Sequence, residues 1–190
     1  MSERFPRIAP EAMTDRQREV AAEISAGPRG EVKGPFIALL HNPELAGCLQ
    51  RVGEHLRFNT GLSGEVVELG ILITARAWDC QYEWIAHRRI ASNTTALPPE
   101  IMDAVARNER PAFMTEELCD VYDFCTEVQA AGVPSAQAYE RVETRYGKRG
   151  VLDLLAICGY YTLLAMVLNT AQLPLPDGMQ APLQPTRRQG

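Results

Sequence analysis

The stretch ELGILITARAWDCQYEWIAH, residues 68–87, decides the fold of this chain because it joins an apolar helical pattern to a polar one. Asp79 belongs to the residue types favoured at helix N-caps, so a second helix is expected to begin there. On that helix Cys80, Glu83 and His87 fall within an arc of about 60°, because each residue advances about 100°. One helical face is therefore predicted to carry a thiol, a carboxylate and an imidazole.

Helix signals continue on both sides of this stretch. Thr14 and Gln17 form a capping-box pattern, and Asn42 followed by Pro43 marks another helix start. No convincing run of alternating apolar and polar residues is present, so the chain is predicted to be all-α. Further helices are expected near residues 98–107, 116–131, 136–146 and 151–169.

Length and composition indicate one soluble globular unit. The 190 residues are 46% hydrophobic and 23% charged, which suits a core that needs no disulfide or metal staple. A net charge of −5 does not favour binding to phosphates, so no nucleic-acid partner is expected. The N-terminal sequence has no apolar signal segment and the five cysteines include no C-x-x-C pair, which predicts a cytoplasmic protein with reduced thiols and no structural zinc.

The most apolar segment is VLDLLAICGYYTLLAMVLN, residues 151–169, which is near the lower limit of a membrane-spanning length. It includes Asp153 and lacks the basic flanks that would set a membrane topology. A buried central helix or a subunit interface is therefore preferred to a membrane span. Tyr160 and Tyr161 could line a pocket, although core packing is the commoner role.

The chain divides into three expected parts. Residues 1–34 form an N-terminal helix and loop extension, residues 35–170 form the helical domain, and residues 171–190 form a proline-rich tail. The tail is expected to pack on a neighbour or to remain mobile. Arg29 and Lys33 lie in the Gly- and Pro-rich loop of the first part, which could act as a lid.

Glu68 interrupts an otherwise apolar run, and a carboxylate that enters a core needs a partner such as His87 or Arg76. Glu83 and His87 are four residues apart, so together with Glu68 they would form a carboxylate–imidazole–carboxylate group that moves protons near neutral pH. The same residues could instead tie two helices together in an oligomer core. A metal site is the third and least favoured interpretation of these residues, because no second histidine lies nearby.

Cys80 has two open interpretations. The first turn of a helix would lower its pKa, whereas Asp79 and Glu83 would raise it, so the sequence leaves the sign open. The thiol is either reactive or a small semi-buried group beneath Trp84.

A small acid substrate would need a cationic anchor. We predict Arg76, Trp84 and Arg88 as the substrate-binding residues, with Arg89, Arg29 and Lys33 as further cationic candidates.

Four polar residues have the spacing of a known signature. With eleven, two and three residues between them they are Glu68, Cys80, Glu83 and His87. This arrangement resembles that of the alkylhydroperoxidase-D-like (AhpD-like) and carboxymuconolactone decarboxylase superfamily. The resemblance covers roughly residues 35–110, including HNPEL at 41–45 and ALPPEIMDAV at 96–105. It implies a single-domain AhpD-like helical fold assembled as a homo-oligomer, either a trimer or a hexamer.

The resemblance also implies cofactor-independent chemistry, with no metal, on a small carboxylated lactone or unsaturated acid. In that reading His87 transfers the proton in a decarboxylation, isomerisation or elimination, Glu68 orients it, and Glu83 is a second acid or base. The peroxidase branch has a second cysteine where this chain has Glu83, so a dithiol cycle would lack its resolving thiol. A peroxidase that uses Cys80 as a single reactive cysteine and a non-catalytic helical oligomer are the alternatives.

Overall fold

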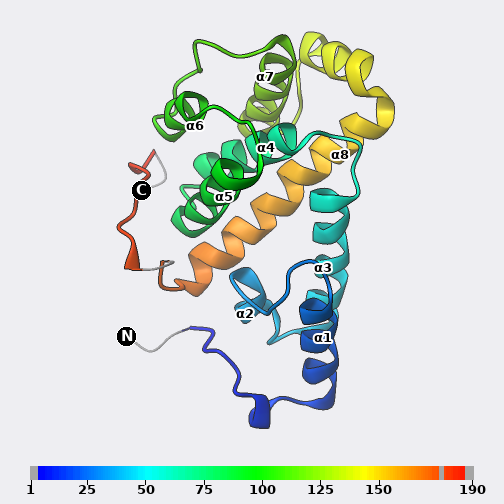
Figure 1. The fold of residues 1–190 in the computed structure, drawn as a ribbon, viewed down its shortest axis with the longest axis vertical. Helices are drawn as coiled ribbons and strands as arrows, with labels where there is room; N and C mark the ends of the chain where they lie inside the picture. The colour runs from blue at the N-terminus through cyan, green and yellow to red at the C-terminus, as the bar shows by residue number, and fades with distance from the viewer. Residues whose placement is uncertain (1–3, 176–177, 187–190) are drawn as a thin grey trace.

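Every regular element of the described residues, 4–175 and 178–186, is a helix in the computed structural model, which confirms the all-α prediction (Figure 1). A short 3-10 turn, η1, precedes eight α-helices. The elements are η1 (Pro10–Ala12), α1 (Asp15–Ala26), α2 (Pro35–Leu39), α3 (Pro43–Phe58), α4 (Gly64–Ala77), α5 (Gln81–Thr94), α6 (Pro99–Ala106), α7 (Glu116–Ala131) and α8 (Ala136–Ala171).

Helix α4 is the centre of the packing, because it contacts α5, α6, α7 and α8, and every residue from Val66 to Arg76 is buried. Helix α8 runs diagonally across the molecule, with α4 and α5 on one side and α3 on the other (Figure 1). The apolar stretch that preceded the motif in the sequence is therefore the core helix on which the motif helix, α5, packs.

Helix starts follow the local signals of the sequence. The hydroxyl of Thr14 accepts a hydrogen bond from the Gln17 amide while the Gln17 side chain accepts one from the Thr14 amide, which is a complete capping box. Four other helices begin with an N-cap side chain that accepts a hydrogen bond from the backbone amide three residues later. These N-cap residues are Asn42, Ser63, Thr115 and Ser135.

Helix α8 contains a break at Gly147, whose φ of 65° lies in the left-handed region that glycine adopts at little cost. The predicted helices near 136–146 and 151–169 are therefore two segments joined at a kink, which is visible in Figure 1. Helix α8 is long and apolar enough to cross a membrane, but 56% of its most apolar window is buried within the structure. Such burial is typical of the core helix of a soluble protein.

The expectation that Asp79 caps α5 is wrong. Cys80 occupies the N-cap without a side-chain hydrogen bond, and Asp79 has a φ of 49° in the turn after α4. Its carboxylate instead accepts hydrogen bonds from Arg76, at short range, and from the amide and hydroxyl of Thr186. Thr186, which is 107 residues away in the sequence, therefore binds the Asp79 carboxylate in place of the amides at the start of α5.

The C-terminal segment packs on its own chain. Gln81 and Leu183 exchange two hydrogen bonds, each 2.9 Å, and the Leu183 side chain is only 2% exposed. The Gln184 carbonyl accepts from Arg76 at 2.7 Å. The described part of the tail thus contacts α4 and α5 of its own chain, and the three-part division of the chain stays a prediction.

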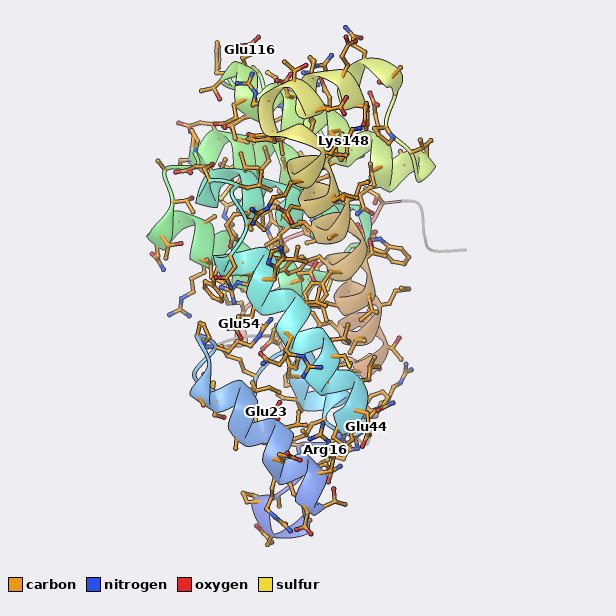
Figure 2. The ribbon with its side chains drawn as sticks, turned by 90° about the vertical axis from the view of Figure 1, so that its right-hand side faces the viewer. Arg16, Glu23, Glu44, Glu54, Glu116 and Lys148 are labelled. Atoms are coloured by element: carbon orange, nitrogen blue, oxygen red, sulfur yellow. The ribbon has the colours of Figure 1, made fainter. Side chains whose placement is uncertain are left out.

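The N-terminal part joins the rest through α1, which packs on α3 and buries Val20 and Ile24. Figure 2 shows charged side chains on the outer side of these helices, among them Arg16 and Glu23 on α1 and Glu54 on α3. Polar residues therefore cover this face while the apolar side of α1 contributes to the core.

Candidate functional site

Glu68 and His87 meet in the core. They lie on the antiparallel helices α4 and α5, and His87 Nδ1 is 2.8 Å from Glu68 Oε2, within hydrogen-bond distance. Both residues are buried, but His87 retains an exposed fraction of 8%, more than the 5% of Glu68. A carboxylate on Nδ1 fixes the ring orientation and leaves Nε2 as the nitrogen available to another molecule.

Glu83 lies one helical turn before His87 and is more deeply buried, with 3% exposed. Neither of its carboxyl oxygens has a hydrogen-bond partner among the described residues. Burial raises the pKa of Glu83 well above its usual value, because the charged form loses its hydration. Burial therefore favours the protonated form of Glu83, whose O–H can donate a hydrogen bond or a proton.

Two tyrosines of α8 complete the surroundings of this Glu68–Glu83–His87 group. The Tyr161 ring contacts the His87 ring edge-to-face at 5.0 Å, and the Tyr160 ring contacts Tyr161 in the same way at 5.2 Å. Burial raises the pKa of both tyrosines, so their hydroxyls stay protonated. The sequence suggested these residues only as possible pocket walls, because no local spacing relates α8 to α5.

Arg29 reaches the same region from the loop between α1 and α2. Its Nη2 donates to the Tyr160 hydroxyl at 3.4 Å, and its guanidinium lies 4.5 Å from the centre of the Phe36 ring. Gly53 on α3 leaves room for this pair, since a Cβ there would overlap both Arg29 and Tyr160. Gly53 and Tyr160 give no signal of this role in a single sequence.

Cys80 is fully buried with Ala165 and Leu168 of α8, and Tyr82 packs against them. Burial, assisted by the charge of Glu83, raises the pKa of Cys80 to about 12. The sequence left open whether the pKa of Cys80 is raised or lowered. It is raised, because loss of hydration outweighs the lowering effect of the helix N-terminus. Cys80 is a protonated core thiol in this arrangement.

Two other thiols lie close together. Cys125 on α7 and Cys158 on α8 are both buried in the same core cluster, and their proximity raises the pKa of Cys125 and lowers that of Cys158. They lie outside the α5 motif, so the dithiol of this chain is not the one that the signature would place after Glu68.

Arg76 does not join the Glu68–Glu83–His87 group. It lies two turns of α4, about 12 Å, beyond Glu68. Its guanidinium is bound to Asp79, to the Ala106 carbonyl at 3.2 Å and to the Gln184 carbonyl. These contacts secure the C-terminal segment and leave Arg76 3% exposed, which does not favour the predicted role as a substrate anchor.

Trp84 and Arg88 border a groove of about 1120 Å³ on the outer side of α5. Lys33 and Tyr82 line the same groove, as does Met179 from the C-terminal segment. Arg88 is paired with Asp103 at 2.6 Å. The groove unites these two predicted substrate-binding residues, but Glu68, Glu83 and His87 are not among its lining residues.

The Glu68–Glu83–His87 group lies outside the groove on α5. Its three side chains, like that of Cys80, line neither this groove nor four other hollows formed by the described residues. Within the same residues no group of three His, Cys, Asp or Glu side chains has a geometry suited to a metal ion. The other histidines are engaged elsewhere: His41 with the Pro6 carbonyl and His55 with Asp153.

This helical arrangement defines the class of fold, and a solved structure shares it. The chain has the AhpD-like fold. The structure described as "alkylhydroperoxidase AhpD core: uncharacterized peroxidase-related protein", from Ralstonia eutropha JMP134, matches with a TM-score of 0.73 over 92% of both chains, at 23% sequence identity. Neither a protein-family model nor a curated protein matches the sequence.

Proposed function

We propose that the protein is an enzyme that transfers protons on a small carboxylated lactone or unsaturated acid, as in carboxymuconolactone decarboxylase, without a cofactor. The observation that carries this proposal is the pairing of two different titratable environments on adjacent turns of α5. His87 is hydrogen-bonded to Glu68 at 2.8 Å, and Glu83 is a carboxyl group without a hydrogen-bond partner among the described residues, whose pKa burial raises well above its usual value. Groups set apart in this way suit a general base and a general acid.

The chemistry follows from the hydrogen-bond pattern. When Glu68 accepts the Nδ1–H of His87, the Nε2 lone pair can remove a proton from a carbon beside a carbonyl. The Glu83 O–H can donate to the oxygen on which the electron pair accumulates. Return of the proton to another carbon isomerises the substrate. If the electron pair comes instead from a breaking bond to a carboxylate, carbon dioxide leaves, and His87 that has first taken up a proton from solvent on Nε2 delivers it to carbon.

A thiol peroxidase is the second candidate function. The related structure from Ralstonia eutropha is described as peroxidase-related, and Cys80 stands at the helix terminus where a reactive thiol is favoured. Its complete burial and raised pKa work against the thiolate that such chemistry needs. Proton transfer by His87 and Glu83 is therefore the first candidate function, and thiol peroxidation by Cys80 is the second.

The test is a paired assay on wild type, His87→Gln, Glu83→Gln and Cys80→Ser. Turnover of muconolactone-like acids is followed by mass spectrometry, and peroxide-dependent thiol oxidation is followed in parallel. We expect His87→Gln to lose about 100-fold or more in acid turnover, the usual contribution of a general base, and Cys80→Ser to retain it. Peroxide consumption that disappears with Cys80 would instead establish the second candidate, and no turnover of either kind would favour a non-catalytic oligomer.

We also propose a cytoplasmic homo-oligomer, a trimer or hexamer as the resemblance implies, with no nucleic-acid or membrane partner. Large apolar side chains on α3 and α8 are exposed, including Leu45, Val52, Leu152 and Met166, with Leu152 at 65%. Leu45 and Met166 also line an apolar hollow of about 490 Å³. Such patches commonly mark subunit contacts. Sedimentation velocity would show the assembly, and a stable monomer at micromolar concentration would contradict it.

A further inference from the structure

Arg29 has an incompletely satisfied guanidinium at the edge of the buried group. Its Nε is buried and has no hydrogen-bond partner among the described residues. Its contact with Tyr160 is to a neutral hydroxyl, at a long distance of 3.4 Å. A guanidinium makes its strongest contacts with a carboxylate, through two parallel N–H donors. The present partner therefore leaves most of the binding capacity of Arg29 unused.

The position of this guanidinium is built by the fold. Phe36 supports its flat face, and the missing side chain at Gly53 lets Arg29 and Tyr160 approach α3. The loop that carries it includes Gly30 and Gly34, which have φ values of 74° and 58°. These are conformations that glycine adopts easily, as expected where a loop has to change direction over a site. In Figure 2 the labelled Glu54 on α3 marks this side of the molecule, since Glu54 lies beside Gly27 at the end of α1.

Continuous contacts connect Arg29 with the proposed base. The Arg29 guanidinium touches the Tyr160 hydroxyl, the Tyr160 ring touches Tyr161, and the Tyr161 ring touches His87. The rings of Tyr160 and Tyr161 therefore lie between Arg29 and His87 along this series of contacts.

The charge balance of this region favours an anion. Burial raises the pKa of Glu83 well above its usual value, which reduces the negative charge that this residue sets against Arg29. Arg57 on α3 adds a second positive charge that acts on both Tyr160 and Tyr161. Arg29 and Arg57 therefore both favour negative charge at the Tyr160 hydroxyl, whereas the carboxyl group of Glu83 opposes it.

We infer that Arg29 binds the carboxylate of the substrate, which replaces the Tyr160 hydroxyl on the guanidinium. This inference rests on the proposed function, because it assigns the non-reacting carboxylate of that substrate a partner. The loop at 27–34 closes behind the bound acid, and Tyr160 stays as a second donor to it. The binding arginine is thus the one on the α1–α2 loop, in place of Arg76, which holds the tail, and Arg88 in the outer groove.

The experiment measures binding of muconolactone and of its uncharged methyl ester by calorimetry, to wild type and to Arg29→Gln. Wild type should bind the acid about 10- to 100-fold more tightly than the ester, the range of a hydrogen-bonded charge pair, and Arg29→Gln should abolish the difference. Arg29→Lys, which keeps a charge but loses the paired donors, should retain an intermediate preference. Arg51→Gln, an exposed arginine two residues before Gly53, is the matched control and should behave as wild type.

Equal binding of acid and ester, absence of binding by either, or an unchanged ratio in Arg29→Gln would overturn the inference. A loss of the ratio in Arg88→Gln but not in Arg29→Gln would move the anchor to the outer groove. His87→Gln separates this inference from the proposed function. Acid binding that depends on Arg29 would support the subsite even in a protein that shows no turnover. Turnover that is unchanged in Arg29→Gln would contradict the subsite but not the proposed function.

Discussion

The protonation state of Glu83 can be tested through the stability of the fold. Because burial raises its pKa, folded Glu83 keeps its proton at pH values where the unfolded chain has released it. The folded state then binds more protons than the unfolded state, so the free energy of unfolding falls as pH rises above 4.5, the ordinary pKa of the group. The decrease continues until the pH reaches the raised folded-state pKa. Its slope is about 1.4 kcal/mol per pH unit, the value for one proton.

Glu83→Gln removes this dependence because glutamine does not titrate. Urea unfolding, followed by circular dichroism between pH 4.5 and 8, should give a wild-type curve that falls relative to the variant, with a limiting slope of about 1.4 kcal/mol per pH unit at pH values between the unfolded-state and folded-state pKa. Any constant cost of the buried amide cancels from the slope. Glu140→Gln, at an exposed position on α8, should run parallel to wild type. Parallel curves for wild type and Glu83→Gln would refute the assignment of Glu83 as a buried neutral acid, and with it the general-acid role.

Three further predictions concern the packing. In native protein at pH 8, iodoacetamide should label the exposed Cys48 and leave Cys80 unlabelled for hours, as read by peptide mass spectrometry; rapid labelling of Cys80 would restore the reactive-thiol interpretation. Gly53→Ala should cost about 1–3 kcal/mol in urea unfolding, because its methyl group overlaps Tyr160 and Arg29; an unchanged midpoint would mean that they are not held there. Leu183→Ala should cost about 2 kcal/mol by the same measurement, since a buried leucine loses its contacts; no effect would mean that the tail is not docked.

Helix positions were predictable because their signals are local. The caps at Thr14, Ser63 and Thr115 join side chains to backbone amides three residues away. Both partners of each hydrogen bond therefore lie in the same short stretch of sequence. Asp79 failed for the opposite reason. It has the right composition for a cap, but Thr186 and Arg76 reach its carboxylate in the folded chain.

By itself the sequence determined that Glu83 and His87 share one face of α5, because helical geometry places them one turn apart whatever surrounds them. It also predicted that Glu68 would need a partner in the core. Only the tertiary structure decided that this partner is His87, that Tyr161 covers its ring, and that Arg29 comes within reach of Tyr160 from 131 residues away. The tertiary structure also decided the direction in which the pKa values of Cys80 and Glu83 are shifted. A pKa depends on how much water the surrounding helices exclude, and that exclusion exists only after α4, α5 and α8 have packed together.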